Sequence, residues 1–159
     1  MAEIDFKSLI AEKAFGAVLD DFLDEKHAEY WLKGGRGSTK SSFISLAILL
    51  GMLMDKNACA IVYRRVGATL KDIVYSQMAW AIDRMGLTPF FRLGKSPLEI
   101  VNTRTGQRIL FRGADDPMKS KSNKLSRGYF KYLWFEELSE FRSMADVRTS
   151  QQSVLCGGK

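Results

Sequence analysis

The sequence of 159 residues predicts a single α/β domain in which helices flank a mostly parallel central sheet. Three observations support this prediction. Residues 41–54 form an apolar stretch of helical length that follows a glycine-rich turn, residues 59–63 and 129–135 are apolar and rich in strand-forming residues, and residues 69–85 carry one apolar stripe at helical spacing. Strands that alternate with helices in this order indicate a sheet built from parallel crossover units.

The first half of the chain contains two elements that must be buried. Residues 41–54 are apolar on all sides, so this helix must pack against a sheet and be covered from outside. Residues 59–63 (CAIVY) form a continuous apolar run, which is typical of a strand buried on both faces. Upstream, residues 5–22 show helical spacing with a break at Gly16, and residues 29–33 (EYWLK) predict a short strand.

The second half of the chain predicts one helix, a hairpin, a long loop and a last strand. Thr69 and Asp72 predict a capping box at the start of the helix over 69–85. Residues 98–101 and 108–111 flank the turn sequence TRTGQ and predict two short strands or a hairpin. A basic loop over 115–127 leads to a strand over 129–135, which ends at two glutamates, and residues 142–155 predict a helix.

Composition narrows the classes of function. The chain has 24 Lys and Arg against 18 Asp and Glu, a formal charge of +6, which favours a polyanionic partner such as nucleic acid or nucleotide. Cys59, Cys156 and the single histidine, His27, are too few for a structural zinc site and give no disulfide framework. The longest apolar run is too short to cross a bilayer, and the first residues lack a signal-peptide core. We expect a cytoplasmic protein with no membrane partner.

The segment GGRGSTKSS nearly matches the phosphate-loop pattern G-x-x-x-x-G-K-[ST], with Thr39 in place of the second glycine. Glycines let successive N–H groups point at phosphate oxygens, and the following helix start adds its dipole. Lys40 would reach the β- and γ-phosphates of ATP, and the Ser41 hydroxyl would hold Mg²⁺. We expect Thr39 to replace glycine with a negative φ. The predicted cradle comprises Gly34, Gly35, Arg36, Gly37, Ser38, Thr39, Lys40 and Ser41.

A glycine- and serine-rich turn before a buried helix would look the same, so the loop alone does not decide between the two interpretations. The run FKYLWFEE supplies the second half of a nucleotide site, because Glu136 at a strand end can hold Mg²⁺ and Glu137 can orient the attacking water. Paired glutamates also occur where a strand simply meets solvent. Both features together, in this order, predict a P-loop NTPase of the ASCE type that binds ATP and Mg²⁺.

Basic residues suggest further contacts. Arg36 lies inside the loop, where a guanidinium could reach the γ-phosphate and stabilise the transition state. Arg64 and Arg65 follow a strand at the edge where ligands bind in parallel sheets, and they mark either a solvated strand end or a contact with DNA or a neighbouring subunit. The loop MKSKSNKLSR contacts DNA phosphates or is only a soluble loop. Its cations are Lys119, Lys121, Lys124 and Arg127.

The remaining conspicuous residues are given structural interpretations. Trp31, Trp80 and Trp134 lie in apolar stretches and are predicted to be in the core, whereas His27 is predicted to be on the surface.

Three blocks of sequence resemble the N-terminal ATPase region of tailed-phage terminase large subunits: KGGRGSTKSSFISL, VYRRVGATLKDIVYSQMAWAI and YLWFEELSEF. The resemblance covers residues 30–159. It implies that Lys40 and Ser41 are the phosphate and Mg²⁺ residues, Arg36 the loop arginine, Glu136 the metal-shell acid and Glu137 the catalytic glutamate. Glu136 departs from the aspartate that is more usual in the family, and Thr39 departs from the loop glycine.

The resemblance also implies a function and a domain organisation. It implies Mg²⁺-dependent ATP hydrolysis that powers translocation of double-stranded DNA into proheads in the bacterial host cytoplasm, with a portal protein and a small terminase subunit as partners of the full-length protein. Residues 1–159 would be one fragment of the ATPase domain, with a helical segment over 1–28, a P-loop core over 29–159 and no nuclease domain. We expect this fragment to bind nucleotide weakly, to hydrolyse it poorly, and to self-associate through an exposed sheet edge.

Two alternatives to the packaging motor remain at this stage. One is another P-loop DNA motor, such as a helicase. The other is a non-catalytic module that binds DNA or a protein partner and keeps the fold without the activity.

Overall fold

A computed structural model of the protein describes residues 9, 12–35, 37, 39–115 and 123–155. The helices are α2 (Glu12–Leu23), α3 (Lys40–Met54), α4 (Ser76–Arg84) and α6 (Met144–Leu155), and the strands are β1 (Ala58–Arg64), β2 (Phe91–Lys95), β3 (Leu98–Asn102), β4 (Arg108–Gly113) and β5 (Tyr129–Phe135). Short helical segments lie at Gly67–Thr69, Lys71–Tyr75, Thr88–Phe90 and Leu138–Glu140. The predicted α/β class is therefore confirmed.

The five strands form one sheet in the order β2-β3-β4-β1-β5. β1 pairs in parallel with both β4 and β5, whereas β2–β3 and β3–β4 are antiparallel. Four of the five strands therefore run in one direction, as expected for a mostly parallel sheet, whereas β3 runs against them, because tight turns join β2, β3 and β4 and only antiparallel strands can be joined that way. The hairpin around TRTGQ is confirmed, while β2 was missed.

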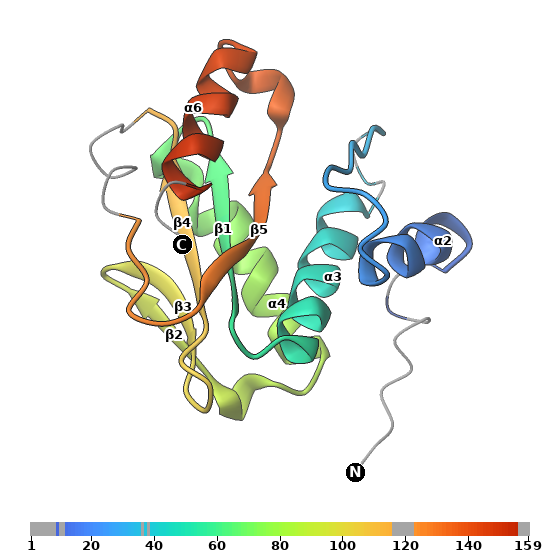
Figure 1. Cartoon of the computed structure of the whole chain (residues 1–159), viewed down its shortest axis with the longest axis vertical. Coiled ribbons are helices and arrows are strands. Elements are labelled where there is room, and N and C mark those ends of the chain that lie inside the picture. Colours follow the sequence, from blue (N-terminus) through green and yellow to red (C-terminus); the bar gives the residue numbers. More distant parts are fainter. Residues whose placement is uncertain (1–8, 10–11, 36, 38, 116–122, 156–159) are drawn as a thin grey trace.

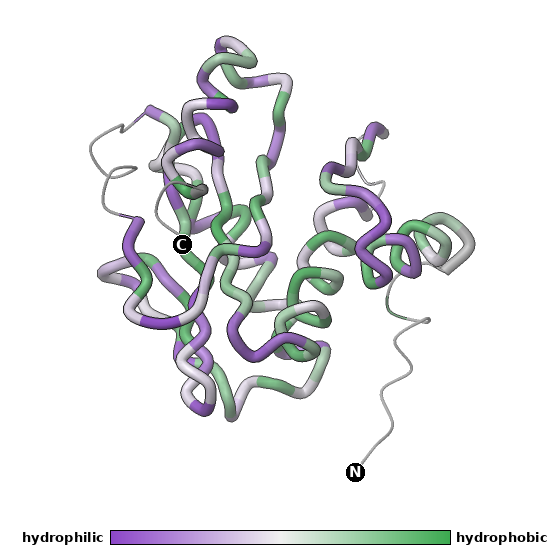
Figure 2. The backbone as a smooth tube through the Cα atoms, in the orientation of Figure 1, coloured by the Kyte–Doolittle hydropathy of each residue, from purple (hydrophilic) through white to green (hydrophobic). Residues whose placement is uncertain are grey.

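The side chains of β1 alternate between two cores on opposite faces of the sheet. Ala60 and Val62 belong to the larger core, which is formed with α2, α3 and α4, and Ile61 and Tyr63 belong to the smaller core beside α6. Every residue of β1 is buried, as the apolar run predicted. Figure 1 shows α3 and α4 on one side of the strands and α6 on the other, and Figure 2 shows hydrophobic residues concentrated along α3 and the central strands.

Two predictions about local structure were wrong, and a third, the helix over 69–85, was correct in position but not in its regular geometry or its cap. Residues 29–33 do not form a strand, since no described strand lies beside them to complete a ladder. α2 runs through Gly16 without a break. The helix predicted over 69–85 consists of a 3₁₀ turn, a π-helical turn and α4, without a side-chain cap, because the Thr69 hydroxyl instead donates to the carbonyl of Val66.

β5 is an edge strand of the described sheet, since β1 is its only hydrogen-bonded neighbour there. Its inner face is tightly packed, because a Cβ added to Gly51 of α3 would lie 2.2 Å from the Tyr132 hydroxyl. An unpaired edge is a template for strand addition, so self-association of the chain remains a prediction.

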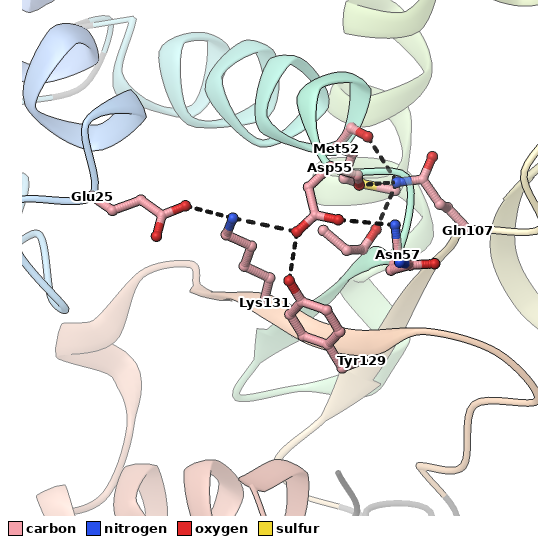
Figure 3. A network of polar contacts seen from close by, with 8 residues as sticks. Glu25, Met52, Asp55, Asn57, Gln107, Tyr129 and Lys131 are labelled. Atoms are coloured by element: carbon pink, nitrogen blue, oxygen red, sulfur yellow. Dashed lines mark hydrogen bonds and ion pairs between the residues drawn. The ribbon is translucent and has the colours of Figure 1, made fainter. Parts of the chain in front are cut away.

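Gln107 joins the end of α3 to the sheet (Figure 3). Its buried side-chain amide donates to the carbonyls of Met52 at 2.8 Å, Asp55 at 2.9 Å and Ala58 at 2.8 Å. These carbonyls lie in the last turn of α3, in the turn after it and at the start of β1; the last carbonyls of a helix have no partner within the helix, and Gln107 supplies one to Met52. One side chain thus fixes where α3 ends and β1 begins.

Lys131 of β5 lies between two carboxylates at the same end of the sheet. Its Nζ atom is 2.6 Å from Glu25 and 3.5 Å from Asp55, and Asp55 also accepts from the Tyr129 hydroxyl (Figure 3). The hydrogen bond with Glu25 raises the pKa of Lys131 above its usual range, and the bond from Tyr129 lowers the pKa of Asp55. The cluster fastens the ends of α2 and α3 to β5.

We predict that Gln107→Glu destabilises the protein by about 2 to 4 kcal/mol. The substitution keeps the shape of the side chain but replaces its amide donor by a carboxyl group that faces carbonyl oxygens. Chemical denaturation measures the loss, and Gln152→Glu on the exposed surface of α6 is the matched control. Equal stability of the two variants would show that Gln107 does not fix the end of α3.

Candidate functional site

The amino end of α3 and the carboxyl end of β5 meet at one edge of the sheet (Figure 1). The Ser41 hydroxyl donates to a carboxylate oxygen of Glu136 at 2.8 Å, across 95 residues of sequence. Because β1 and β5 are parallel, their carboxyl ends open at this edge, and α3 begins there to pack back along the sheet. The structure thus brings together the predicted loop serine and the predicted strand-end acid.

Lys40 is the first residue of α3, and its side chain turns back onto the glycine-rich loop. Its Nζ atom donates to the carbonyl oxygens of Gly34 at 2.7 Å and Gly35 at 3.2 Å. The carbonyl groups of Gly34 and Gly35 therefore face the ammonium group. This end of α3 also presents N–H groups and the positive end of the helix dipole, which together favour an anion.

Two residues of the site have left-handed backbone conformations. Thr39, the residue before α3, has a φ of 57°, and Glu137, the residue after Glu136, has a φ of 52°. The expectation of a negative φ at Thr39 was wrong: the backbone takes the conformation of the missing glycine. For residues with a Cβ this conformation costs about 1 to 3 kcal/mol, and such strain is found preferentially at functional sites.

The two glutamates point to different surroundings. Glu136 continues the ladder between β5 and β1, since its N–H donates to the carbonyl of Tyr63 at 2.9 Å, and it is half-buried. Glu137 is exposed and begins the 3₁₀ turn Leu138–Glu140. The change to a left-handed φ directs one carboxylate toward α3 and leaves the next one at the surface.

The residues predicted to contact DNA differ in how exposed they are. Arg64 is only 8% exposed and its guanidinium contacts Thr69 and Glu140, whereas Arg65, Lys124 and Arg127 are exposed. A buried guanidinium in this arrangement is not presented to a DNA backbone. Arg36, Ser38, Lys119 and Lys121 lie outside the described residues.

Some contributors at and near the site were missed by sequence reasoning. Gln77 of α4 donates to the Ser42 hydroxyl at 3.4 Å, so α4 also contacts the start of α3. Upstream of Gly34, Asp21 accepts from Tyr30 and pairs with His27, whose hydrogen bond lowers the pKa of Asp21. No motif marks these contacts, because they join residues of different elements or of a loop.

The aromatic predictions had mixed outcomes. His27 is exposed and Trp134 is buried, as predicted. Trp31 and Trp80 were wrongly placed in the core, since they are 57% and 39% exposed. Trp31 lies beside a hollow of about 370 Å³ between α2 and residues 27–32.

The Ser41 hydroxyl and the Glu136 carboxylate are the oxygen ligands that the site offers to Mg²⁺. Within the described ranges, no group of three or more His, Cys, Asp or Glu side chains could hold a metal. Mg²⁺ does not require such a cage, because it is usually bound by one or two protein oxygens, substrate phosphates and water. The Ser41 hydroxyl and the Glu136 carboxylate, in contact at 2.8 Å beside a loop lysine, fit that pattern.

The helices that the structure describes include none with the length and apolar character needed to cross a membrane.

The fold and the site define an α/β protein in which a loop lysine, a serine and two strand-end glutamates share one sheet edge. Residues 26–152 match the family described as phage terminase large subunit. The chain is 40% identical over 130 residues to the large terminase subunit of Bacillus phage SPP1, covering 82% of this chain and 31% of that protein. It is 36% identical over 113 residues to the PBSX phage terminase large subunit of Bacillus subtilis strain 168, covering 70% of this chain and 24% of that protein.

The chain therefore belongs to the phage terminase large subunit family, and the predicted resemblance is confirmed. It spans about a third or less of the length of these two relatives.

We predict that Thr39→Gly raises the free energy of unfolding by up to about 1.5 kcal/mol, because relief of about 1 to 2 kcal/mol of left-handed strain exceeds the added chain entropy of glycine, about 0.5 to 1 kcal/mol. Thr149→Gly, in the regular helix α6, is the matched control and should lose about 0.3 to 0.5 kcal/mol. Chemical denaturation of both variants tests this. A larger loss at Thr39 than at Thr149 would contradict the strained conformation.

Proposed function

We propose that this chain forms the nucleotide-binding part of a Mg²⁺-dependent P-loop ATPase of the ASCE type, which powers translocation of double-stranded DNA into phage proheads. One observation carries the proposal: Ser41, directly after Lys40, is hydrogen-bonded to Glu136 at the carboxyl edge of the sheet. A P-loop ATPase requires this meeting of a loop hydroxyl and a strand-end carboxylate, since both act on the same metal ion.

Each residue of the site has a chemical task in this proposal. Lys40 neutralises the β- and γ-phosphates of ATP, and it exchanges the loop carbonyls for phosphate oxygens when nucleotide binds. Ser41 and Glu136 hold Mg²⁺, which supplies charge neutralisation on the phosphates. Glu137 orients the attacking water, and Arg36 stabilises charge on the γ-phosphate, as the family resemblance implies.

The proposed polymer substrate is double-stranded DNA. The net charge of +6 favours a polyanion, and the exposed cations Arg65, Lys124 and Arg127 are the described candidates for backbone contacts. Phosphate contacts position a protein on DNA without reading its sequence, which suits a motor that must move along any sequence. In the full-length protein we expect contacts with a portal protein and a small terminase subunit, in the cytoplasm of the bacterial host.

Family membership favours a packaging motor over another P-loop DNA motor, such as a helicase. The remaining alternative is a module that binds DNA or a protein partner and does not use nucleotide. Nucleotide binding and DNA binding, measured separately, distinguish these possibilities.

We predict that Mg-ATP at millimolar concentration raises the melting temperature of the wild-type chain and leaves that of Lys40→Ala unchanged. Ligand at ten to one hundred times its dissociation constant stabilises a protein by about 1.4 to 2.7 kcal/mol, which corresponds to roughly 3 to 8 °C here. Differential scanning fluorimetry with and without Mg²⁺ measures the shift. Lys56→Ala, an exposed lysine just beyond α3, is the matched control and should respond as wild type does.

If ATP never changes the melting temperature while DNA binding survives Lys40→Ala, the non-catalytic module replaces the motor. A shift that does not require Mg²⁺ would contradict the roles given to Ser41 and Glu136.

A further inference from the structure

We propose that Arg64 is a positioning residue that holds the turn carrying Glu137, and this role rests on the ATPase function proposed above. Arg64 is the last residue of β1, the strand that pairs with β5. Among the residues that the structure describes, its guanidinium contacts Thr69 and Glu140, and Glu140 belongs to the segment that follows the strand-end glutamates. The two adjacent arginines therefore have different tasks, Arg64 inside the protein and Arg65 on its surface.

The guanidinium of Arg64 joins two segments. One terminal nitrogen donates to the hydroxyl of Thr69, in the connection from β1 to α4. The other lies 3.8 Å from a carboxylate oxygen of Glu140, the last residue of the 3₁₀ turn that begins immediately after Glu137. The Glu140 N–H also donates to the Glu137 carbonyl at 2.8 Å, so the position of Glu140 constrains the position of Glu137.

The two arms of the bridge differ in strength. Thr69 is itself fixed, because its hydroxyl donates to the Val66 carbonyl at 2.9 Å. Glu140 is 46% exposed and its distance from Arg64 lies near the limit for an ion pair, so this arm is weak and easily exchanged. Arg64 is thus held firmly by its hydrogen bond to Thr69, and it contacts the turn Leu138–Glu140 through the weaker ion pair with Glu140.

The contact between Arg64 and Thr69 links Arg64 to the start of α3. Thr69 precedes the π-helical turn Lys71–Tyr75, which continues into α4, and Gln77 of α4 reaches Ser42, the neighbour of Ser41. π-Helical turns occur frequently at functional sites. Arg64 therefore connects the turn of Glu137 with the elements that contact the start of α3, in addition to the direct contact between Ser41 and Glu136.

A buried donor distinguishes Arg64 from an ordinary strand-end residue. Arg64 is 8% exposed, and its Nε atom is buried without a hydrogen-bond partner among the residues that the structure describes. Buried polar groups are nearly always paired, so each exception calls for an explanation. The explanation here is geometric: the two terminal nitrogens of Arg64 are directed at Thr69 and Glu140, and this orientation leaves Nε without an acceptor.

The test compares binding of Mg-ADP with binding of Mg-ADP-aluminium fluoride, which mimics the γ-phosphoryl group under attack by water. A correctly placed Glu137 contributes to the second complex and not to the first. The primary variant is Glu140→Gln, because its exposed side chain can change without disturbing the core. We expect the Mg-ADP dissociation constant to stay within about twofold of wild type and the aluminium fluoride complex to weaken about five- to tenfold.

Further variants separate positioning from stability. Thr69→Val should reproduce the selective loss and Thr69→Ser, which keeps the hydroxyl, should restore wild-type binding. Arg64→Lys combined with Glu140→Gln should lose no more than the larger single effect, since both act through one contact. Arg148→Ala, an exposed arginine of α6, is the matched control.

The binding measurements distinguish failure of the ATPase function from failure of the positioning role of Arg64. If wild type binds neither complex, the proposed ATPase function fails first. If wild type binds both equally, or if Glu140→Gln and Thr69→Val weaken both complexes equally, Arg64 has no positioning role. If wild type prefers the aluminium fluoride complex and the variants lose only that preference, the role of Arg64 is supported.

Discussion

The contact between the Ser41 hydroxyl and the Glu136 carboxylate is the constraint on which the site depends. It joins two segments 95 residues apart, and it exists only because β1 and β5 run in parallel and α3 begins at their carboxyl edge. The buried β1 and the all-apolar α3 set that geometry, since each has to be covered on both sides. The position of Ser41 beside Glu136 therefore follows from how α3 and β1 pack in the core.

The site also stores conformational strain on both sides of this contact. Thr39 and Glu137 are left-handed at the points where the chain enters α3 and leaves β5. At the other end of the sheet, Gln107 closes the end of α3, and Lys131 of β5 contacts Glu25 and Asp55, which follow α2 and α3. A firmly held opposite end of the sheet lets the strained end keep its geometry.

The sequence predicted the elements that follow from hydrophobic pattern, including α3, β1 and β5, and it predicted that Ser41 and the strand-end acid Glu136 lie together. It did not predict what depends on neighbours. Residues 29–33 read as a strand but have no described partner strand, and β2 is short and largely exposed, so its pattern is weak. The difference between Arg64 and Arg65 could not be predicted, because only the fold decides which side chain turns inward.

The most direct test of the central claim is a crystal structure of the chain with Mg²⁺ and a non-hydrolysable ATP analogue. We expect the metal to lie about 2.1 Å from the Ser41 hydroxyl oxygen, Glu136 to contact the metal or one of its waters, and Lys40 to have left the loop carbonyls for the phosphates. Nucleotide bound elsewhere, or a metal that contacts neither Ser41 nor Glu136, would contradict this expectation.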